Sequence, residues 1–341
     1  MTTHRNVWRL RKRPVGDIKE GDLTYEREAL PELKDGQFLL EVLYLSLDPT
    51  NRIWMSDMRQ YMPPVPLDAP MRGGVAGRVV ASKKPGVKEG DVYFGLGEFA
   101  DYIVTDGSNF TKAELPAGLP LSVGYGIFGL VGPTAYFGLL HVGKPKEGET
   151  LVVSAASGGV GQIVGQIGKI KGLHVIGIAG GPEKCRYLTE ELGFDAAIDY
   201  KNEDVGKQLD ALAPKGVDIN FEQVGGPIME AVMSRMNLFG RMPLCGMISG
   251  YNNEKPAPGP RTWPLILMQR LTVQGFIIFD FIKHYDEMFR ELGGWIAEGR
   301  IKTRQDVRKG LENAIDYLGL LYTGGNTGKL LVEVHPDAGK L

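Results

Sequence analysis

The chain has 341 residues, a formal net charge of −2 and an ordinary aliphatic and aromatic content, so we expect about two globular domains. The nearly balanced charge leaves no basic footprint, and we expect neither nucleic acid nor a membrane as a partner. The N-terminus lacks the apolar core of a signal peptide, and we find no apolar run near the ~20 residues that span a bilayer. Cys185 and Cys245 are far apart in the sequence, which favours a reducing, cytoplasmic location.

The first 120 or so residues are rich in strand and turn signals. Residues 38–48, 73–82 and 88–106 favour strands, and the proline-rich stretch 57–71 (DMRQYMPPVPLDAPM) predicts a loop. This pattern predicts a partly open β-barrel.

From about residue 120, strand-like and helix-like segments alternate. Strands are expected in TLVVSAA, HVIGIAG, AAIDY, VDINF and RMPLCGMIS, and a helix is expected in AVMSRMNLF (231–239). Alternation at this spacing indicates βαβ units and a parallel sheet. Residues 284–301 and 306–324 predict two further helices, and 329–334 (KLLVEV) predicts a strand that returns to the first domain.

The stretch VVSAASGGVGQIVGQIGKIKG (152–172) joins a predicted strand to a predicted helix through small residues. Ala156 to Gly161 fits the pattern G-x-G-x-x-G, with alanine in the first place. Small residues allow a tight turn whose backbone contacts a pyrophosphate, and the helix N-terminus offers N–H groups to the anion. We therefore predict dinucleotide binding here; the alternative is a glycine-rich turn without a ligand.

The end of the next strand indicates which dinucleotide is bound. NAD enzymes usually place Asp or Glu there to hold the ribose 2′-OH, whereas this strand ends in Ala179-Gly180-Gly181. Lys184 and Arg186 follow, within reach of a phosphate. The sequence therefore predicts NADP(H); the alternative for these two cations is a solvated start of a helix.

Motifs along nearly the full length resemble a known family. They are SLDPTNRIWM, MRGGVAGRV, GPTAYFGL, VVSAASGGVGQIVGQIGKIKG, GIAGGPEKC, ELGFDAAIDYK, NFEQVGG, CGMISGYN and GGNTGKLLV. The chain resembles the zinc-independent medium-chain dehydrogenases/reductases, in the branch of prostaglandin reductases, plant alkenal double-bond reductases and bacterial curcumin reductases. The resemblance implies an α/β fold: a GroES-like β-barrel domain (1–125 plus 310–341) and a Rossmann domain with a doubly wound parallel sheet (126–309). It also implies NADPH as cofactor and a homodimer.

The resemblance carries a set of cofactor contacts onto this sequence. The implied residues are Pro133, Thr134, Gly158, Gly159, Val160, Gly161, Gln162, Lys184, Tyr200, Gln223, Cys245, Gly246, Ile248, Ser249, Tyr251, Phe276, Ile277, Ile278 and Asn326. Gln223 stands where the family usually carries asparagine, and its extra methylene should reposition the amide.

The positions that bind zinc in the wider family carry other residues here. Ser46-Leu47-Asp48 stands where a catalytic cysteine is expected, and Gly73-Gly74-Val75 stands where Gly-His-Glu is expected. The five histidines are scattered singly, whereas a zinc site needs N and S ligands that converge on one point. We expect no metal.

Two further segments have open interpretations. GGNTGK (324–329) lacks one spacer residue of a phosphate-binding P-loop, so we expect a turn that carries Asn326 toward the cofactor. The apolar helix expected at 263–268 (WPLILM) could lie in the core, at a dimer surface or against the substrate, with core or interface as the default.

Without a metal, hydride transfer to the double bond of an enone or enal is the favoured reaction. Negative charge then develops on the carbonyl oxygen, which needs a hydrogen-bond donor. Tyr251 and Tyr61 are the candidate donors, and the ribose 2′-OH of the cofactor is an alternative. A quinone or carbonyl reductase on the same scaffold, or an NADPH-binding protein without turnover, are the rival functions.

Overall fold

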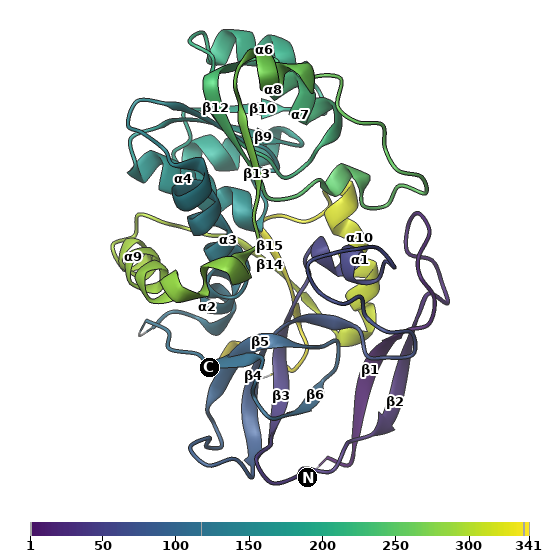
Figure 1. Cartoon of the computed structure of the whole chain (residues 1–341). Coiled ribbons are helices and arrows are strands. Elements are labelled where there is room, and N and C mark those ends of the chain that lie inside the picture. Colours follow the sequence, from purple (N-terminus) through teal and green to yellow (C-terminus); the bar gives the residue numbers. More distant parts are fainter. Residues whose placement is uncertain (1, 117, 337, 341) are drawn as a thin grey trace. The chain divides into compact units, whose positions relative to one another are not determined.

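The computed structural model in Figure 1 describes residues 2–116, 118–336 and 338–340. The chain divides into a first unit of Met1–Gly129, Gln305–Asn326 and Leu330–Leu341, and a second unit of Leu130–Arg304 and Thr327–Lys329. A boundary after residue 125 would cut helix α2 (Leu121–Phe128), and one after residue 309 would part strand β14 (Gln305–Lys309) from its sheet.

The first unit is built mainly from antiparallel strands. Its described elements are β1 (His4–Leu10), β2 (Leu23–Ala29), β3 (Phe38–Ser46), α1 (Thr50–Trp54), β4 (Arg72–Ser82), β5 (Val92–Glu98), β6 (Tyr102–Thr105), β7 (Phe110–Lys112), α2, β14, 3₁₀ turn η5 (Leu311–Asn313), α10 (Ala314–Thr323), β15 (Lys329–Glu333) and 3₁₀ turn η6 (Ala338–Lys340). In the described residues, β1 pairs with β2, and a larger sheet runs β14-β15-β3-β4-β5-β7 with β6 beside β3. The prediction that the C-terminal strand returns to this domain is confirmed, because Leu331 of β15 pairs antiparallel with Ser46 of β3.

The core of the first unit surrounds β3, whose nine residues are all buried. Phe38, Trp54 and Phe99 are each at most 2% exposed and pack in one cluster with this strand. Burial of a large apolar side chain stabilises a fold by roughly 1.5–3 kcal/mol, so these rings hold the loops that follow β3 in place.

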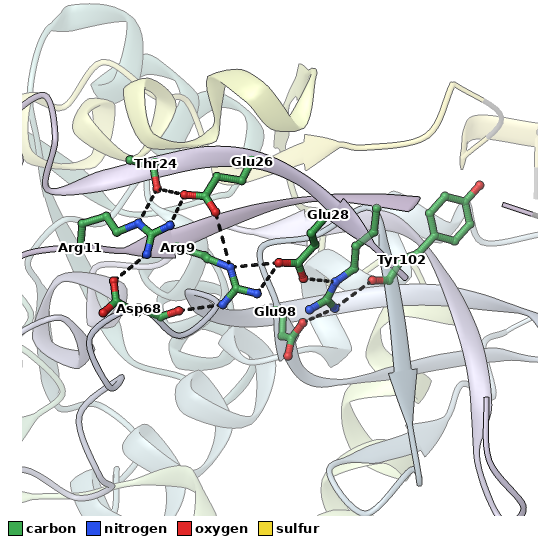
Figure 2. A network of polar contacts seen from close by, with 9 residues as sticks. Arg9, Arg11, Thr24, Glu26, Glu28, Asp68, Glu98 and Tyr102 are labelled. Carbon is green, nitrogen blue, oxygen red and sulfur yellow. Dashed lines mark hydrogen bonds and ion pairs between the residues drawn. The ribbon is translucent and has the colours of Figure 1, made fainter. Parts of the chain in front are cut away.

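Arginines of β1 and its C-terminal extension pair with acids of β2 (Figure 2). Glu28 accepts hydrogen bonds from Arg5 (2.8 Å) and from Arg9, and Glu26 accepts from Arg11. Arg5 also donates to Glu98 of β5. Arg5, Arg9 and Arg11 are therefore part of one ion-pair network, and such a network stabilises more than isolated surface pairs do.

The second unit contains a six-stranded parallel sheet in the described residues, with the order β10-β9-β8-β11-β12-β13. The chain fills one half of the sheet outward from β8 and then returns to fill the other half from β11, which is the doubly wound order. The elements are α3 (Val131–Phe137), π-helical η1 (Gly138–Gly143), β8 (Thr150–Val153), α4 (Gly159–Ile170), β9 (His174–Ala179), α5 (Pro182–Arg186), π-helical η2 (Tyr187–Glu191), β10 (Ala196–Asp199), α6 (Val205–Leu212), β11 (Val217–Phe221), α7 (Gly226–Met233), β12 (Met236–Leu244), 3₁₀ turn η3 (Ile248–Gly250), α8 (Pro264–Met268), β13 (Thr272–Gly275), 3₁₀ helix η4 (Ile278–His284) and α9 (Tyr285–Ala297).

Two predicted helices extend too far. Residues 236–239 belong to β12 rather than to the helix before it, and β14 takes the start of the segment expected to be helical at 306–324. In β12 the pairing with β11 is irregular, and Phe239 has a φ of +63°. This break hides the alternation that marks a strand, so sheet pairing overrides a pattern that locally resembles a helix.

The expectation that no apolar run approaches membrane-spanning length is wrong. In the described residues, Leu121–Gly143 is a 23-residue helical segment with a mean hydropathy of 1.4, enough to span a bilayer by length and composition. The segment has no Asp, Glu, Lys or Arg, and glycines mask its apolar character in the sequence. Of its most apolar window 72% is buried, as in a core helix, so it is weak support for a membrane span.

Candidate cofactor and active site

Apart from Pro133 and Thr134 in α3, the predicted site residues of the second unit follow the carboxyl ends of its parallel strands. Gly158–Gln162 follow β8, Lys184 follows β9 and Tyr200 follows β10. On the other half, Gln223, residues 245–251 and residues 276–278 follow β11, β12 and β13. Carboxyl ends of neighbouring parallel strands meet at one edge, where doubly wound folds bind their ligands.

The small-residue turn after β8 has the geometry that the fingerprint predicts. Ala155 has a φ of +47°, and the N–H of Ala156 donates to the Ile178 carbonyl of β9 (3.0 Å). A Cβ on Gly161 would lie 2.5 Å from the Ala155 carbonyl oxygen, so only glycine lets α4 start this close to the strand. The first N–H groups of α4 lack partners inside the helix and are available to an anion.

The C-terminal segment completes this turn, which sequence analysis missed. Gly328 forms a parallel bridge with Gly158, and the buried side chain of Lys329 runs over Gly159. A Cβ on Gly159 would lie 3.0 Å from Lys329 Cδ. The GGNTGK motif therefore contributes a lysine beside the turn, although it lacks P-loop spacing.

The side-chain amides of Gln162 and Gln223 form hydrogen bonds to other residues of the protein. The Oε1 of Gln162 accepts from the Tyr187 hydroxyl (2.7 Å) and from the Arg304 N–H (2.9 Å), so contact with an anion is left to its backbone. The Gln223 side chain donates to the Ser154 carbonyl, and its N–H donates to Ser154 Oγ (2.8 Å). The Gln223 amide is thus bonded back to the residue that follows β8, and its repositioning relative to the family's asparagine stays a prediction.

Glu222 is a buried carboxylate that sequence analysis did not single out. Its Oε1 accepts from the N–H groups of Val224 (2.6 Å) and Gly225 (2.8 Å) and from Ser154 Oγ (3.2 Å), and its Oε2 accepts from Asn220 Nδ2 (3.1 Å). Burial raises the pKa of Glu222 above its usual value. The only signal in the sequence was an acid directly after the strand-like VDINF stretch.

The loop after β12 packs on the Glu222 loop and carries Tyr251. The Cys245 N–H donates to the Glu222 carbonyl (2.9 Å), and Ser249 Oγ donates to the Val224 carbonyl (2.6 Å). The Tyr251 hydroxyl accepts from the Met247 N–H (3.0 Å). Burial beside Glu222 raises the pKa of the Cys245 thiol to about 12, so this thiol stays protonated at neutral pH.

Aromatic and apolar residues form the remaining contacts of this half. Phe276 lies 6.3 Å from Phe221 between ring centres, and a Cβ on Gly138 would lie 2.4 Å from the Phe276 ring. Ile277 has an extended backbone, and Ile278 begins η4. In α3, Pro133 is buried and Thr134 Oγ1 donates to the Leu130 carbonyl (2.7 Å).

Tyr61 and Asn326 belong to the first unit. Tyr61 is 42% exposed, and its hydroxyl accepts from Trp54 Nε1 (2.8 Å) and bonds to Thr50 Oγ1. Burial of the hydroxyl raises the pKa of Tyr61. Asn326 lies between α10 and β15.

The positions expected to bind zinc in the wider family do not fit a metal here. Ser46 Oγ donates to Asp48, and Gly74 and Val75 stand at the His and Glu positions of the zinc enzymes without a metal-ligating side chain. Across residues 2–116, 118–336 and 338–340, no group of three or more His, Cys, Asp or Glu could hold a metal ion.

Comparison with known proteins gives matches over nearly the full chain. Residues 6–113 match the family described as N-terminal domain of oxidoreductase, and residues 159–298 match the family described as zinc-binding dehydrogenase. The NADPH-dependent curcumin reductase of Escherichia coli (strain K12) is 44% identical over 97% of this chain and 97% of that protein. Prostaglandin reductase 1 of Bos taurus is 38% identical over 97% of this chain and 99% of that protein.

Solved structures agree with these matches. The crystal structure of CurA in complex with NADPH from Vibrio vulnificus has a TM-score of 0.91 and 41% identity, over 97% of this chain and 99% of that chain. The expected GroES-like domain and Rossmann domain are thereby confirmed. The chain belongs to the medium-chain dehydrogenase/reductase family, in the branch of curcumin and prostaglandin reductases.

Proposed function

We propose that this protein is an NADPH-dependent reductase that saturates the carbon–carbon double bond of α,β-unsaturated aldehydes or ketones. The proposal agrees with the names of its relatives, such as the NADPH-dependent curcumin reductase of E. coli. The observation that carries the proposal is the small-residue turn at α4, next to β9, whose last residue Ala179 is followed by Gly180-Gly181 and no carboxylate.

The cofactor is proposed to bind at the carboxyl edge of the parallel sheet. The first turn of α4 offers N–H groups to the pyrophosphate, and Lys184 and Tyr200 lie at the β9–β10 side for the 2′-phosphate. Residues 245–251 and 276–278 at the β12–β13 side are assigned to the nicotinamide end. When bound, the reduced nicotinamide supplies a hydride.

Tyr251 is proposed to donate a hydrogen bond to the substrate carbonyl oxygen as negative charge develops there. Its oxygen is held by the Met247 N–H, which fixes the ring on the loop beside the proposed nicotinamide site. A fixed donor costs no reorganisation when the charge appears, which is how oxyanion donors accelerate reactions. Tyr61 is the second proposed donor.

Catalysis is proposed to proceed without zinc. The residues at 46–48 and 73–75 cannot form the ligand set of the zinc enzymes. The tyrosine hydroxyls are therefore proposed to polarise the carbonyl oxygen of the substrate in place of a metal ion. In a reductase of this kind, chelators should leave activity unchanged.

A homodimer and a cytoplasmic location complete the proposal. In the described residues β13 pairs with β12 and leaves its other edge unpaired, and α8 exposes Leu267 (72%) and Met268 (60%). An open sheet edge next to exposed apolar side chains favours a second copy of the same chain as its partner. The two free cysteines agree with a reducing compartment.

The assay that tests this function follows NADPH oxidation with a panel of enones, enals, quinones and saturated ketones, with and without EDTA. We expect turnover of enones and enals that EDTA does not reduce. Turnover of quinones or saturated ketones alone would favour the rival reductases, and tight NADPH binding without turnover of any of them would favour a non-catalytic role.

The role of Tyr251 is tested with Tyr251→Phe. We expect kcat on an enone to fall by roughly tenfold to a thousandfold, the scale of one lost oxyanion donor, while the Kd of NADPH barely changes because the ring remains. Reduction of a quinone, whose charge spreads over a conjugated ring, should lose less. An unchanged kcat on the enone would remove Tyr251 from the mechanism, and Tyr61→Phe would then examine the second donor.

A further inference from the structure

The turns after β9 and β10 meet at Gly180. A Cβ on Gly180 would lie 2.9 Å from Tyr200 Cε1, 3.0 Å from the Tyr200 hydroxyl oxygen and 3.0 Å from Lys201 Cε. The Tyr200 ring and the Lys201 side chain therefore both lie across the turn that follows β9. Any larger residue at position 180 would push them away.

Asp199 holds the two turns together. Its Oδ1 accepts from the Gly181 N–H (2.7 Å) and from the Lys201 N–H (3.1 Å), and its Oδ2 accepts from Asn202 Nδ2 (2.7 Å). The residue is 8% exposed. Because its carboxylate bonds to donors from both turns, Asp199 fixes the backbone of Lys201 next to the Gly180 turn, from which the exposed Lys201 side chain lies across Gly180.

The charge of the ligand proposed for this corner exceeds what one lysine neutralises. A phosphate monoester carries about −1.5 to −2 at neutral pH. Lys184 in α5 supplies one positive charge, and Lys201 approaches the same turn from the neighbouring loop with a second. Residues Ala179–Gly181 also lack the Asp or Glu that binds the ribose 2′-OH in NAD enzymes and would repel a 2′-phosphate.

We propose that Lys201 is a specificity-determining residue that binds the 2′-phosphate of NADPH together with Lys184 and Tyr200, and that Asp199 positions it. This inference rests on the proposed cofactor and adds a second cation to its site. The Lys201 ammonium contacts the 2′-phosphate, whereas NADH offers only a hydroxyl at that position.

The test measures the Kd of NADPH and of NADH by fluorescence titration for the wild type and Lys201→Gln. We expect the Kd of NADPH to rise about tenfold, the lower range for a charge-assisted bond at an exposed site, and the Kd of NADH to stay within about twofold. The retained NADH affinity also reports that the variant is folded. Lys215→Gln, an exposed lysine before β11, is the matched control and should leave both constants unchanged.

The outcomes separate the two levels of the proposal. If the wild type binds NADPH no more tightly than NADH, the cofactor assignment and the role of Lys201 both fail. If the wild type prefers NADPH and Lys201→Gln keeps the full preference, or loses both cofactors equally, the role of Lys201 fails while the proposed function stands.

Discussion

At the scale of single residues, the sequence predicts the small-residue turn after β8 but not the buried acid in the loop after β11. The glycine-rich turn follows from Ala156 to Gly161 alone, because small residues between a strand and a helix have few other uses. Glu222 could not be found in this way. A buried acid in one sequence shows its partners only after folding brings Ser154, from the end of β8, next to the loop after β11.

The titration of Glu222 gives a prediction for stability. Burial raises its pKa in the folded protein above the ordinary value of 4.5, so the folded state binds this proton more tightly than the unfolded state does. The stability that the group contributes is fully present below pH of about 4.5 and is lost as the pH rises through the folded pKa. Glu222→Gln has no such titration.

Urea unfolding of the wild type and Glu222→Gln between pH 4.5 and 8 checks this prediction. We expect the stability of the variant relative to the wild type to improve as the pH rises. A difference in unfolding free energy that stays constant over this range would show that Glu222 keeps its ordinary pKa in the fold.

At the scale of elements, the pattern of apolar residues predicts the parallel strands, because strands that are buried on both faces appear as continuous apolar runs. β8 is buried throughout, and so is β9 after its first residue. The period fails at β12, where an irregular pairing and the positive φ of Phe239 disturb the alternation. The pattern also leaves the packing partner of α8 open, because an apolar helix shows the same pattern whether it packs against the core or against another chain.

The exposed face of α8 leads to a prediction about assembly. Leu267→Lys puts a charge on the most exposed apolar side chain of α8, so we expect a proposed dimer to dissociate into monomers of 37.3 kDa. Light scattering after size exclusion measures this mass. Val15→Lys, at an apolar residue 60% exposed in the first unit, is the control. A dimeric Leu267→Lys variant, or a monomeric wild type, would contradict the assignment of this face.

At the scale of the whole molecule, the resemblance of motifs along the chain predicts the fold that the comparisons confirm. The limits of the domains are harder to predict, because the second unit takes Thr327–Lys329 from a segment whose neighbours belong to the first. Such an exchange depends on contacts such as the bridge between Gly158 and Gly328, which no local pattern contains.

The central claim is that a hydride reaches the β-carbon of an enone rather than its carbonyl carbon. The measurement is NMR of the product formed from benzalacetone with NADPH that carries deuterium at the transferable position. Our account predicts the saturated ketone, with the deuterium on its β-carbon. An allylic alcohol with the deuterium on the carbinol carbon would contradict it and identify a carbonyl reductase.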